Sequence, residues 1–135
     1  MIYFIRSYNE FIKIGTSIDP DGRKESLQTA SPKKLHVQAV LEGSYKTEKG
    51  LHELFDHIRV RGEWFRYTDE MKWFIRAIQE NPEQSNIYSL YRLSQEMRLR
   101  AKAKRLGKNH SLSKRIKNLD ARHSSQRLLS SGSKS

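Results

Sequence analysis

The sequence contains no cysteine, and this absence excludes several kinds of site. Disulfide frameworks, iron–sulfur clusters, thiol catalysis and zinc sites built on thiolate all require that residue. The chain also lacks any long apolar run, so it offers neither a transmembrane span nor a signal-peptide core. Its seven glycines form no G-x-G-x-x-G or P-loop pattern, which removes the common nucleotide-binding folds. We therefore expect an intracellular, soluble protein.

Negative charge is scarce in one part of the chain only. The 135 residues include 26 Lys and Arg against 15 Asp and Glu, for a net charge of +11. Residues 92–135 hold 13 basic and two acidic residues, whereas residues 1–91 hold 13 of each sign. A neutral N-terminal part is thus joined to a polycationic extension, which predicts an acidic partner, with nucleic acid the first candidate.

Composition predicts a domain boundary near residue 80. Residues 81–86 collect Asn, Pro and Ser between two segments with periodic apolar residues. Eleven of the 13 aromatic residues lie at or before Phe74, and aromatic side chains carry most of the burial available to a small core. We predict a folded domain over residues 1–79 and a basic helical extension over residues 80–135. The end of this extension, beyond residue 106, is expected to be disordered.

The first 79 residues alternate between strand-like and helix-like segments. Segments rich in β-branched and aromatic residues predict strands at 2–5, 11–14, 36–41 and, as a short piece, 63–67. Helical spacing with capping residues predicts helices that begin at Asp19, near Ser44 and at Thr68. The expected fold class is α+β, a small domain with a three-stranded antiparallel sheet flanked by helices.

Five short motifs follow one another along this domain. They are Ile2-Tyr3-Phe4-Ile5, Lys13-Ile14-Gly15, Arg23, Glu48-Lys49-Gly50-Leu51-His52 and Gly62-Glu63-Trp64-Phe65. In this order and with this spacing they resemble the GIY-YIG nuclease superfamily, in particular its small phage-associated branch. The resemblance covers residues 1 to about 75.

The resemblance implies metal-assisted hydrolysis of a phosphodiester. Its catalytic tyrosine, arginine and metal-binding carboxylate fall on Tyr3, Arg23 and Glu48, with Mg²⁺ or Mn²⁺ as the metal. Hydrolysis of a phosphodiester itself requires groups of these types. It needs a group that activates water, a cation that binds the phosphate oxygens, and a hard metal with oxygen ligands. His52, four residues after Glu48, shares its helix face. We expect His52 to orient a phosphate or to pack under the site.

Two positions depart from the superfamily pattern. Lys13 replaces its second tyrosine, and would either ease ionisation of Tyr3 or bind phosphate directly. The superfamily's late asparagine has no clear match. Glu63 has a purely structural interpretation, in which it pairs with Arg59 or Arg61. Each candidate also has such an alternative: Tyr3 as a core aromatic residue, and Lys13 as an exposed residue of an alternating strand.

The extension predicts an amphipathic helix over residues 84–106 that docks on the domain. Its apolar stripe is Ile87, Leu90, Tyr91, Ser94, Met97 and Ala101. Five of the eight residues from 98 to 105 are basic, and acidic partners are missing from that segment, so it should contact phosphates without reading bases. The predicted contacts are Arg98, Arg100, Lys102, Lys104, Arg105, Lys108, Lys114, Arg115 and Lys117. A second short helix near Leu112, Ile116 and Leu119 would fold only on binding.

These features together predict a metal-dependent endonuclease that acts on DNA, with RNA as the other candidate polyanion. A membrane partner is not expected, because the helix lacks a bulky apolar face. The expected compartment is the cytoplasm, at the nucleoid or, for a phage protein, in the host cell. Two alternatives stay open: a catalytically inactive nucleic-acid-binding protein that retains the fold, and an adaptor whose basic helices dock an acidic protein.

Overall fold

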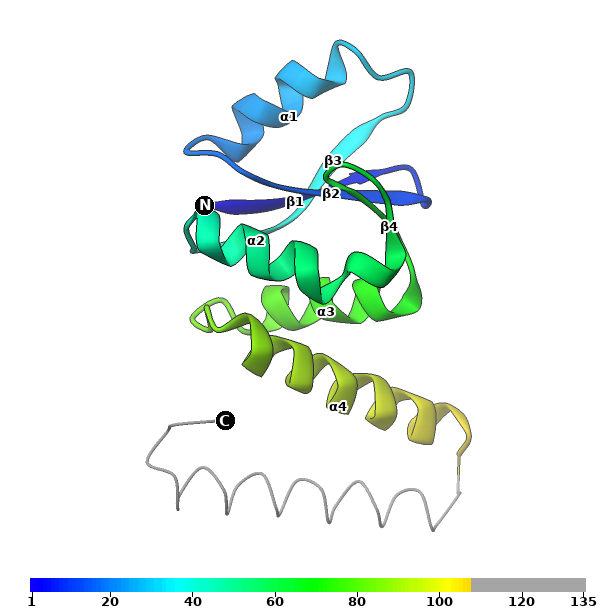
Figure 1. Ribbon diagram of the computed structural model, residues 1–135. Helices are drawn as coiled ribbons and strands as arrows, with labels where there is room; N and C mark the ends of the chain where they lie inside the picture. The colour runs from blue at the N-terminus through cyan, green and yellow to red at the C-terminus, as the bar shows by residue number, and fades with distance from the viewer. Residues whose placement is uncertain (108–135) are drawn as a thin grey trace.

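A five-stranded antiparallel sheet lies at the centre of the computed structural model, which describes residues 1–107. Its strands occur in the order β3-β1-β2-β5-β4. Their bounds are β1 Ile2–Ser7, β2 Phe11–Thr16, β3 Leu35–Leu41, β4 Arg59–Arg61 and β5 Trp64–Arg66. One helix covers one face of the sheet, two cover the other, and a fourth helix lies outside those two (Figure 1).

The α+β class is confirmed, but the prediction of three strands is wrong. The sheet gains β5, which falls inside the predicted segment 63–67, and β4, which the sequence did not indicate. Each of these strands has three residues, too few to show the alternation that identifies a strand. A tight turn joins them at Gly62, whose φ of 55° lies in the left-handed region that glycine adopts without strain.

Strand β1 lies between β3 and β2, and both of its faces are covered. Ile2 and Phe4 belong to the main core, on the side of the two paired helices, whereas Tyr3 and Ile5 belong to a smaller apolar cluster on the opposite face. Side chains that alternate between two buried faces require a nearly continuous apolar strand. The run from Ile2 to Ile5 meets that requirement.

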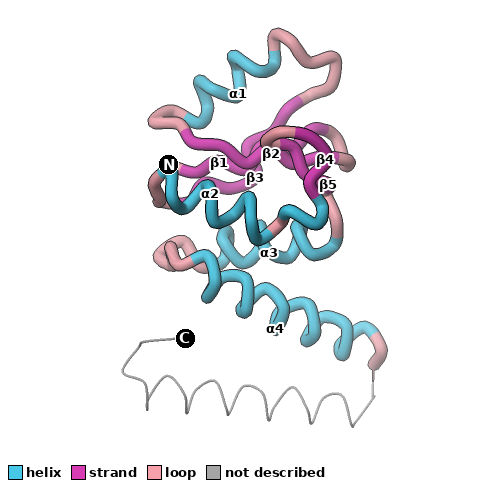
Figure 2. Tube along the Cα trace, viewed as in Figure 1, coloured by secondary structure: helices cyan, strands magenta, loops and turns pink. Residues whose placement is uncertain are grey.

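Four α-helices and one 3₁₀ turn complete the described residues. They are α1 Pro20–Gln28, α2 Tyr45–Leu54, the 3₁₀ turn Asp56–Ile58, α3 Asp69–Glu80 and α4 Ile87–Arg105. The predicted helix starts are confirmed, since the side chains of Asp19, Ser44 and Thr68 each accept a hydrogen bond from a backbone N–H in the first turn. Figure 2 shows α1 alone on its side of the sheet.

Helix α4 packs against the domain, as the apolar stripe predicted. Ile87 and Leu90 are buried in the main core, and the Tyr91 ring lies 6.0 Å from that of Phe55 and 6.4 Å from that of Phe74. The division of the chain between residues 79 and 80 stays a prediction.

Within residues 1–107, no helix combines the length and apolar character needed to cross a membrane. Disorder is predicted beyond residue 106, and all of that segment except Gly107 lies outside the described residues. The predicted helix near Leu112, Ile116 and Leu119 lies outside them too.

Candidate functional site

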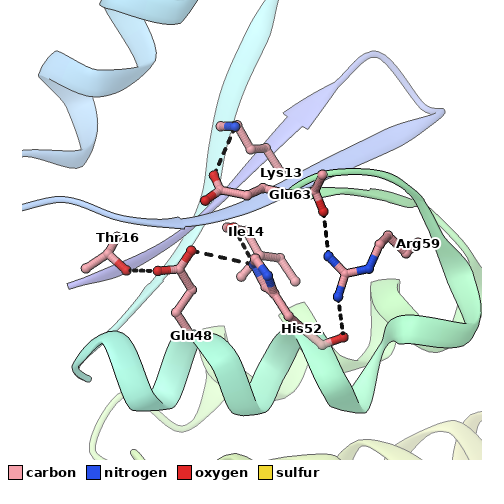
Figure 3. Close-up of polar contacts among 8 residues, drawn as sticks. Lys13, Ile14, Thr16, Glu48, His52, Arg59 and Glu63 are labelled. Carbon is pink, nitrogen blue, oxygen red and sulfur yellow. Dashed lines mark hydrogen bonds and ion pairs between the residues drawn. The ribbon is translucent and has the colours of Figure 1, made fainter.

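Glu48 is a buried carboxylate at the start of α2. It is only 6% exposed, Thr16 Oγ1 donates a hydrogen bond to its Oε1, and His52 Nε2 lies 3.6 Å from its Oε2 (Figure 3). The first turn of a helix is a favourable place for a negative charge, because the helix dipole is positive there. Among the described residues, no Lys or Arg forms an ion pair with this carboxylate. Glu48 is therefore a buried anion held by groups that carry no fixed positive charge.

His52 ties α2 to the sheet. Its Nε2 lies 2.9 Å from the carbonyl oxygen of Ile14, and its ring meets that of Phe65 edge-on at 5.2 Å. A carbonyl oxygen can only accept, so Nε2 carries the hydrogen and donates it. In this arrangement Nε2 is not free to bind a metal. The geometry matches the packing role that we considered for His52, and contact with a phosphate stays a prediction.

Tyr3 lies on the other face of the sheet, directly over Gly15, its partner in β2. A Cβ at position 15 would lie 2.3 Å from Tyr3 Oη, so only glycine leaves room for the phenol. The residue is 2% exposed, yet its hydroxyl makes no hydrogen bond with another described residue. Since no buried polar side-chain atom in residues 1–107 lacks a partner, this hydroxyl must reach solvent.

Tyr3 and Glu48 thus contact consecutive residues, Gly15 and Thr16, where β2 ends. The N–H of Ser17 donates to the carbonyl oxygen of Met1 at 2.9 Å and fixes the chain just beyond this point. The N-terminus, the loop before α1 and the start of α2 lie together at the same end of the sheet (Figure 1). We call this region, residues 1–3, 15–18 and 45–48, the site end.

Lys13 is held in an ion pair on the same face as Tyr3. Its Nζ lies 3.0 Å from Glu63 Oε1 and 5.5 Å from the centre of the Trp64 ring, and its side chain is 11% exposed. Lys13 stands opposite Ile5 in β1, two positions along the sheet from the pair of Tyr3 and Gly15. Figure 3 places the contact of Lys13 with Glu63 across β2 from Glu48.

The prediction that Glu63 pairs with Arg59 or Arg61 is wrong. Glu63 pairs with Lys13, while Arg59 binds Asp56 at 2.8 Å and donates to the carbonyl oxygens of Gly62 and His52. The reason is the hairpin of β4 and β5, which brings Glu63 beside β2, where its own carbonyl oxygen accepts the N–H of Ile14 at 3.0 Å.

Arg23 stands apart from the other candidates. It is exposed in the first turn of α1, the helix that covers the Tyr3 face, and forms no ion pair among the described residues. The structure therefore leaves its guanidinium available to a ligand, but does not bring it into contact with Tyr3 or Glu48.

The donor set at the site end fits a hard divalent ion. Across residues 1–107, no three His, Asp or Glu side chains gather as a metal cage would require. Mg²⁺ usually binds through one or two carboxylates, with waters and substrate phosphates as its remaining ligands. The Glu48 carboxylate, with the Thr16 hydroxyl beside it, supplies donors of that type.

Sequence reasoning missed one polar residue, Thr16, and the ion-pair partner of another, Glu63. Thr16 orients Glu48, and Glu63 holds Lys13. A signal for Thr16 was its position directly after Lys13-Ile14-Gly15, at the end of a strand. No local signal pointed to the pairing of Glu63, because it depends on how a distant hairpin docks.

The basic residues of α4 divide into two groups. The predicted lack of acidic partners is wrong for Arg98, which pairs with Asp69 of α3 at 2.9 Å, and for Arg100, which lies 3.7 Å from Glu96. Asp69 is 29 residues away in the sequence, so only the docking of α4 on α3 creates its contact. Lys102, Lys104 and Arg105 are exposed and form no ion pair within residues 1–107. The predicted contacts Lys108, Lys114, Arg115 and Lys117 lie outside the described residues.

Comparison with known proteins gives the class of the domain. Residues 1–81 match the T5orf172 domain, a phage-associated domain related to GIY-YIG and HNH-like nucleases. The match defines this α+β domain as one of a phage-type, nuclease-like or DNA-binding class. The chain belongs to the T5orf172 domain family. No curated protein and no solved structure matches it.

Proposed function

We propose that the chain is a metal-dependent endonuclease that hydrolyses DNA phosphodiester bonds, with Glu48 as the protein ligand of Mg²⁺ or Mn²⁺. The observation that carries this proposal is the Glu48 carboxylate, which is buried at the end of the sheet without a Lys or Arg partner among the described residues. Burying a carboxylate that has no Lys or Arg partner costs free energy, and a bound divalent cation would offset that cost. Membership of a family related to nucleases supports the same conclusion.

Four of the predicted residues each have a proposed step in the reaction. A divalent ion at Glu48 would neutralise charge that develops on the phosphate oxygens and make bound water more acidic. The Tyr3 hydroxyl, which reaches solvent over Gly15, would orient the attacking water. Once this hydroxyl has released its own proton to solvent, the resulting phenolate would accept the proton of that water. The exposed Arg23 guanidinium matches two non-bridging phosphate oxygens. Lys13 would contribute positive potential on the Tyr3 face, where Glu63 fixes its position.

Binding of the DNA backbone falls to α4 in this proposal. Lys102, Lys104 and Arg105, which we call the basic end of α4, are exposed and free of ion pairs within residues 1–107. Cations of this kind neutralise phosphates whatever the sequence, so they add affinity without specificity. The site end and the basic end of α4 would then divide cleavage and binding between them.

The experiment is incubation of the purified full chain with supercoiled plasmid and with branched DNA, in Mg²⁺ and in EDTA. We expect nicked or linear products in Mg²⁺ only. Intact DNA in Mg²⁺, with binding retained in a gel-shift assay, would contradict the nuclease. Pull-down of an acidic protein, with no binding to DNA, would favour the adaptor instead.

One observation favours a second candidate, a non-enzymatic DNA-binding protein that retains the fold. Lys13 stands where the superfamily has a tyrosine, and its ammonium is engaged by Glu63. An ammonium in an ion pair is a poor proton acceptor, so this position would contribute to phosphate binding alone. Cleavage in Mg²⁺ by the wild-type chain decides between the two candidates.

A further inference from the structure

Two large apolar side chains project into solvent at the site end. Ile18 is 95% exposed and Tyr45 is 73% exposed. Ile18 lies in the loop that follows Thr16, and Tyr45 opens α2, three residues before Glu48. An isoleucine that is almost fully exposed contributes none of the burial that its side chain could supply to the fold. Ile18 comes two residues after Thr16, which holds Glu48, and Tyr45 is one helical turn before Glu48, so both side chains are suited to contact a ligand of that carboxylate.

Each of these apolar side chains is followed in the sequence by a cation that forms no ion pair among the described residues. Residues three and four apart share a helix face, so Glu48 and Lys49 lie on the same side of α2 as Tyr45. Lys49 and Arg23 are exposed, and neither forms an ion pair among the described residues. Exposed apolar side chains, together with cationic side chains that form no ion pair, complement a ligand that combines phosphates with flat apolar faces. A nucleic-acid strand is such a ligand.

Whether such a ligand is single-stranded or double-stranded follows from the accessibility of the base faces. In a duplex the faces of the bases are stacked on one another and only their edges are accessible in the grooves. An exposed tyrosine ring or isoleucine side chain can reach a base face only where the base is unpaired or the stack is opened. The pair of Ile18 and Tyr45 therefore selects unpaired nucleotides next to the phosphate that is cut.

We infer that Ile18 and Tyr45 form a stacking site for unpaired bases of a DNA strand, which makes single-stranded or locally opened DNA the substrate class. The inference rests on the proposed function for one point only, the position of a phosphate at Glu48. Stacking by Tyr45 would hold the base on one side of that phosphate, and Ile18 the base on the other. Because stacking tolerates every base, this site would confer a preference for structure and not for sequence.

The test is a binding measurement that does not require cleavage. Fluorescence anisotropy in EDTA compares the full chain with its Tyr45→Ala and Ile18→Ala variants, on a single-stranded oligothymidylate and on an abasic strand of equal length. Tyr8→Ala is the matched control, because Tyr8 is an exposed tyrosine in the turn between β1 and β2, at the opposite end of these strands. Circular dichroism checks that the variants fold.

We expect Tyr45→Ala to weaken binding of oligothymidylate by about 5- to 150-fold, the range for loss of one stacked base. Ile18→Ala should act in the same direction with a smaller effect. Neither variant should change binding of the abasic strand or the slope of log K against log salt, since no phosphate contact is lost. Tyr8→Ala should match the wild type on both strands.

Equal losses on the oligothymidylate and abasic strands would overturn the inference, as would an unchanged affinity for both. Self-association of the wild type that Tyr45→Ala abolishes would overturn it too, because the two side chains would then cover a second copy. Since every arm is measured without metal, failure of the stacking site is distinguishable from failure of the nuclease, which the plasmid assay detects separately.

Discussion

The site end and the basic end of α4 are built in opposite ways. Glu48 is buried, and its carboxylate is fixed by Thr16 and flanked by His52, residues that come from two different elements. Lys102 and Lys104 extend into solvent from a single helix and contact no acidic partner within residues 1–107. One region is defined by tertiary contacts and the other by the composition of one segment.

This difference corresponds to the two tasks that we propose. Chemistry at a phosphate needs groups held in a fixed geometry before the substrate arrives, which only packing and hydrogen bonds can supply. Attraction of a polyanion needs only positive charge, and flexible exposed side chains provide it. Substitutions at the site end should therefore reduce turnover, whereas substitutions at the basic end should reduce affinity.

Among the substitutions that leave the proposed metal ligand in place, the largest effect is expected for Tyr3→Phe. The change removes only the hydroxyl that reaches solvent over Gly15, and the ring can still pack in its cluster. We expect turnover to fall at least about a hundredfold, the contribution of a positioned proton acceptor, with thermal unfolding unchanged. Single-turnover cleavage of plasmid measures the rate. Tyr8→Phe is the control, and activity within a few-fold of the wild type for Tyr3→Phe would remove Tyr3 from the reaction.

Arg23→Ala should cost on the order of 3 kcal/mol of transition-state stabilisation, about a hundredfold in kcat, if its guanidinium meets the developing charge. Because Arg23 is exposed on α1, the substitution should leave the stability of the fold unchanged, and melting curves check this. Lys24→Ala, the adjacent residue, serves as the control. A defect confined to KM would reassign Arg23 to ground-state phosphate contact.

At the basic end, replacing Lys102, Lys104 and Arg105 together by Ser should change binding and not chemistry. Each lost phosphate contact lowers the log–log salt slope by about 0.9 on duplex DNA, so the slope should fall by up to about 2.7. A salt titration of DNA affinity measures it, and kcat should be unchanged. The charge-matched control replaces three cations that are engaged by carboxylates, Lys24, Lys33 and Arg76. Equal slopes for the wild type and the basic-end variant would show that this end does not bind DNA.

The smallest effect concerns how α4 is attached. Tyr91 Oη donates to Glu70 Oε2, and burial together with this carboxylate raises the pKa of Tyr91 to about 12. Loss of this hydrogen bond in Tyr91→Phe should lower the free energy of unfolding by about 1–2 kcal/mol. The unfolded chain releases the phenol proton near pH 10 and the folded chain only near pH 12, so this stabilisation is present below pH 10 and is lost as the pH rises through that interval.

Urea denaturation of the wild type and Tyr91→Phe at pH 8 and pH 11 measures this effect. The difference between the two proteins should shrink at the higher pH. A difference independent of pH would show that the hydrogen bond to Glu70 does not control the ionisation of Tyr91.

The comparison also explains which features the sequence predicted. Helix starts at Asp19, Ser44 and Thr68 were predictable, because a cap is a local interaction between residues two or three apart. The amphipathic stripe of α4 likewise depends on spacing within one segment. Strand β4 was not predictable, since three residues carry no periodic signal and their pairing is set by the turn at Gly62.

Contacts at the candidate site depend on tertiary structure. Motifs drew attention to Glu48, Lys13 and Glu63. They did not point to Thr16, which precedes Glu48 by 32 positions, nor to the ion pair that Glu63 forms with Lys13 across 50 positions. The ion pair of Arg98 was missed for the same reason. Residue types that chemistry requires can thus be identified in the sequence, whereas their hydrogen-bond partners require the fold.

The most direct test of this account is a side-by-side assay of the wild type and Glu48→Gln for both Mg²⁺-dependent cleavage and DNA binding. The change keeps the size of the side chain and removes its negative charge, so one anionic metal ligand is lost. Glu53→Gln, an exposed position on the same helix, is the control. The account predicts that Glu48→Gln binds DNA as the wild type does and no longer cleaves it. Cleavage by Glu48→Gln at the wild-type rate would contradict the assignment of Glu48 as the metal ligand.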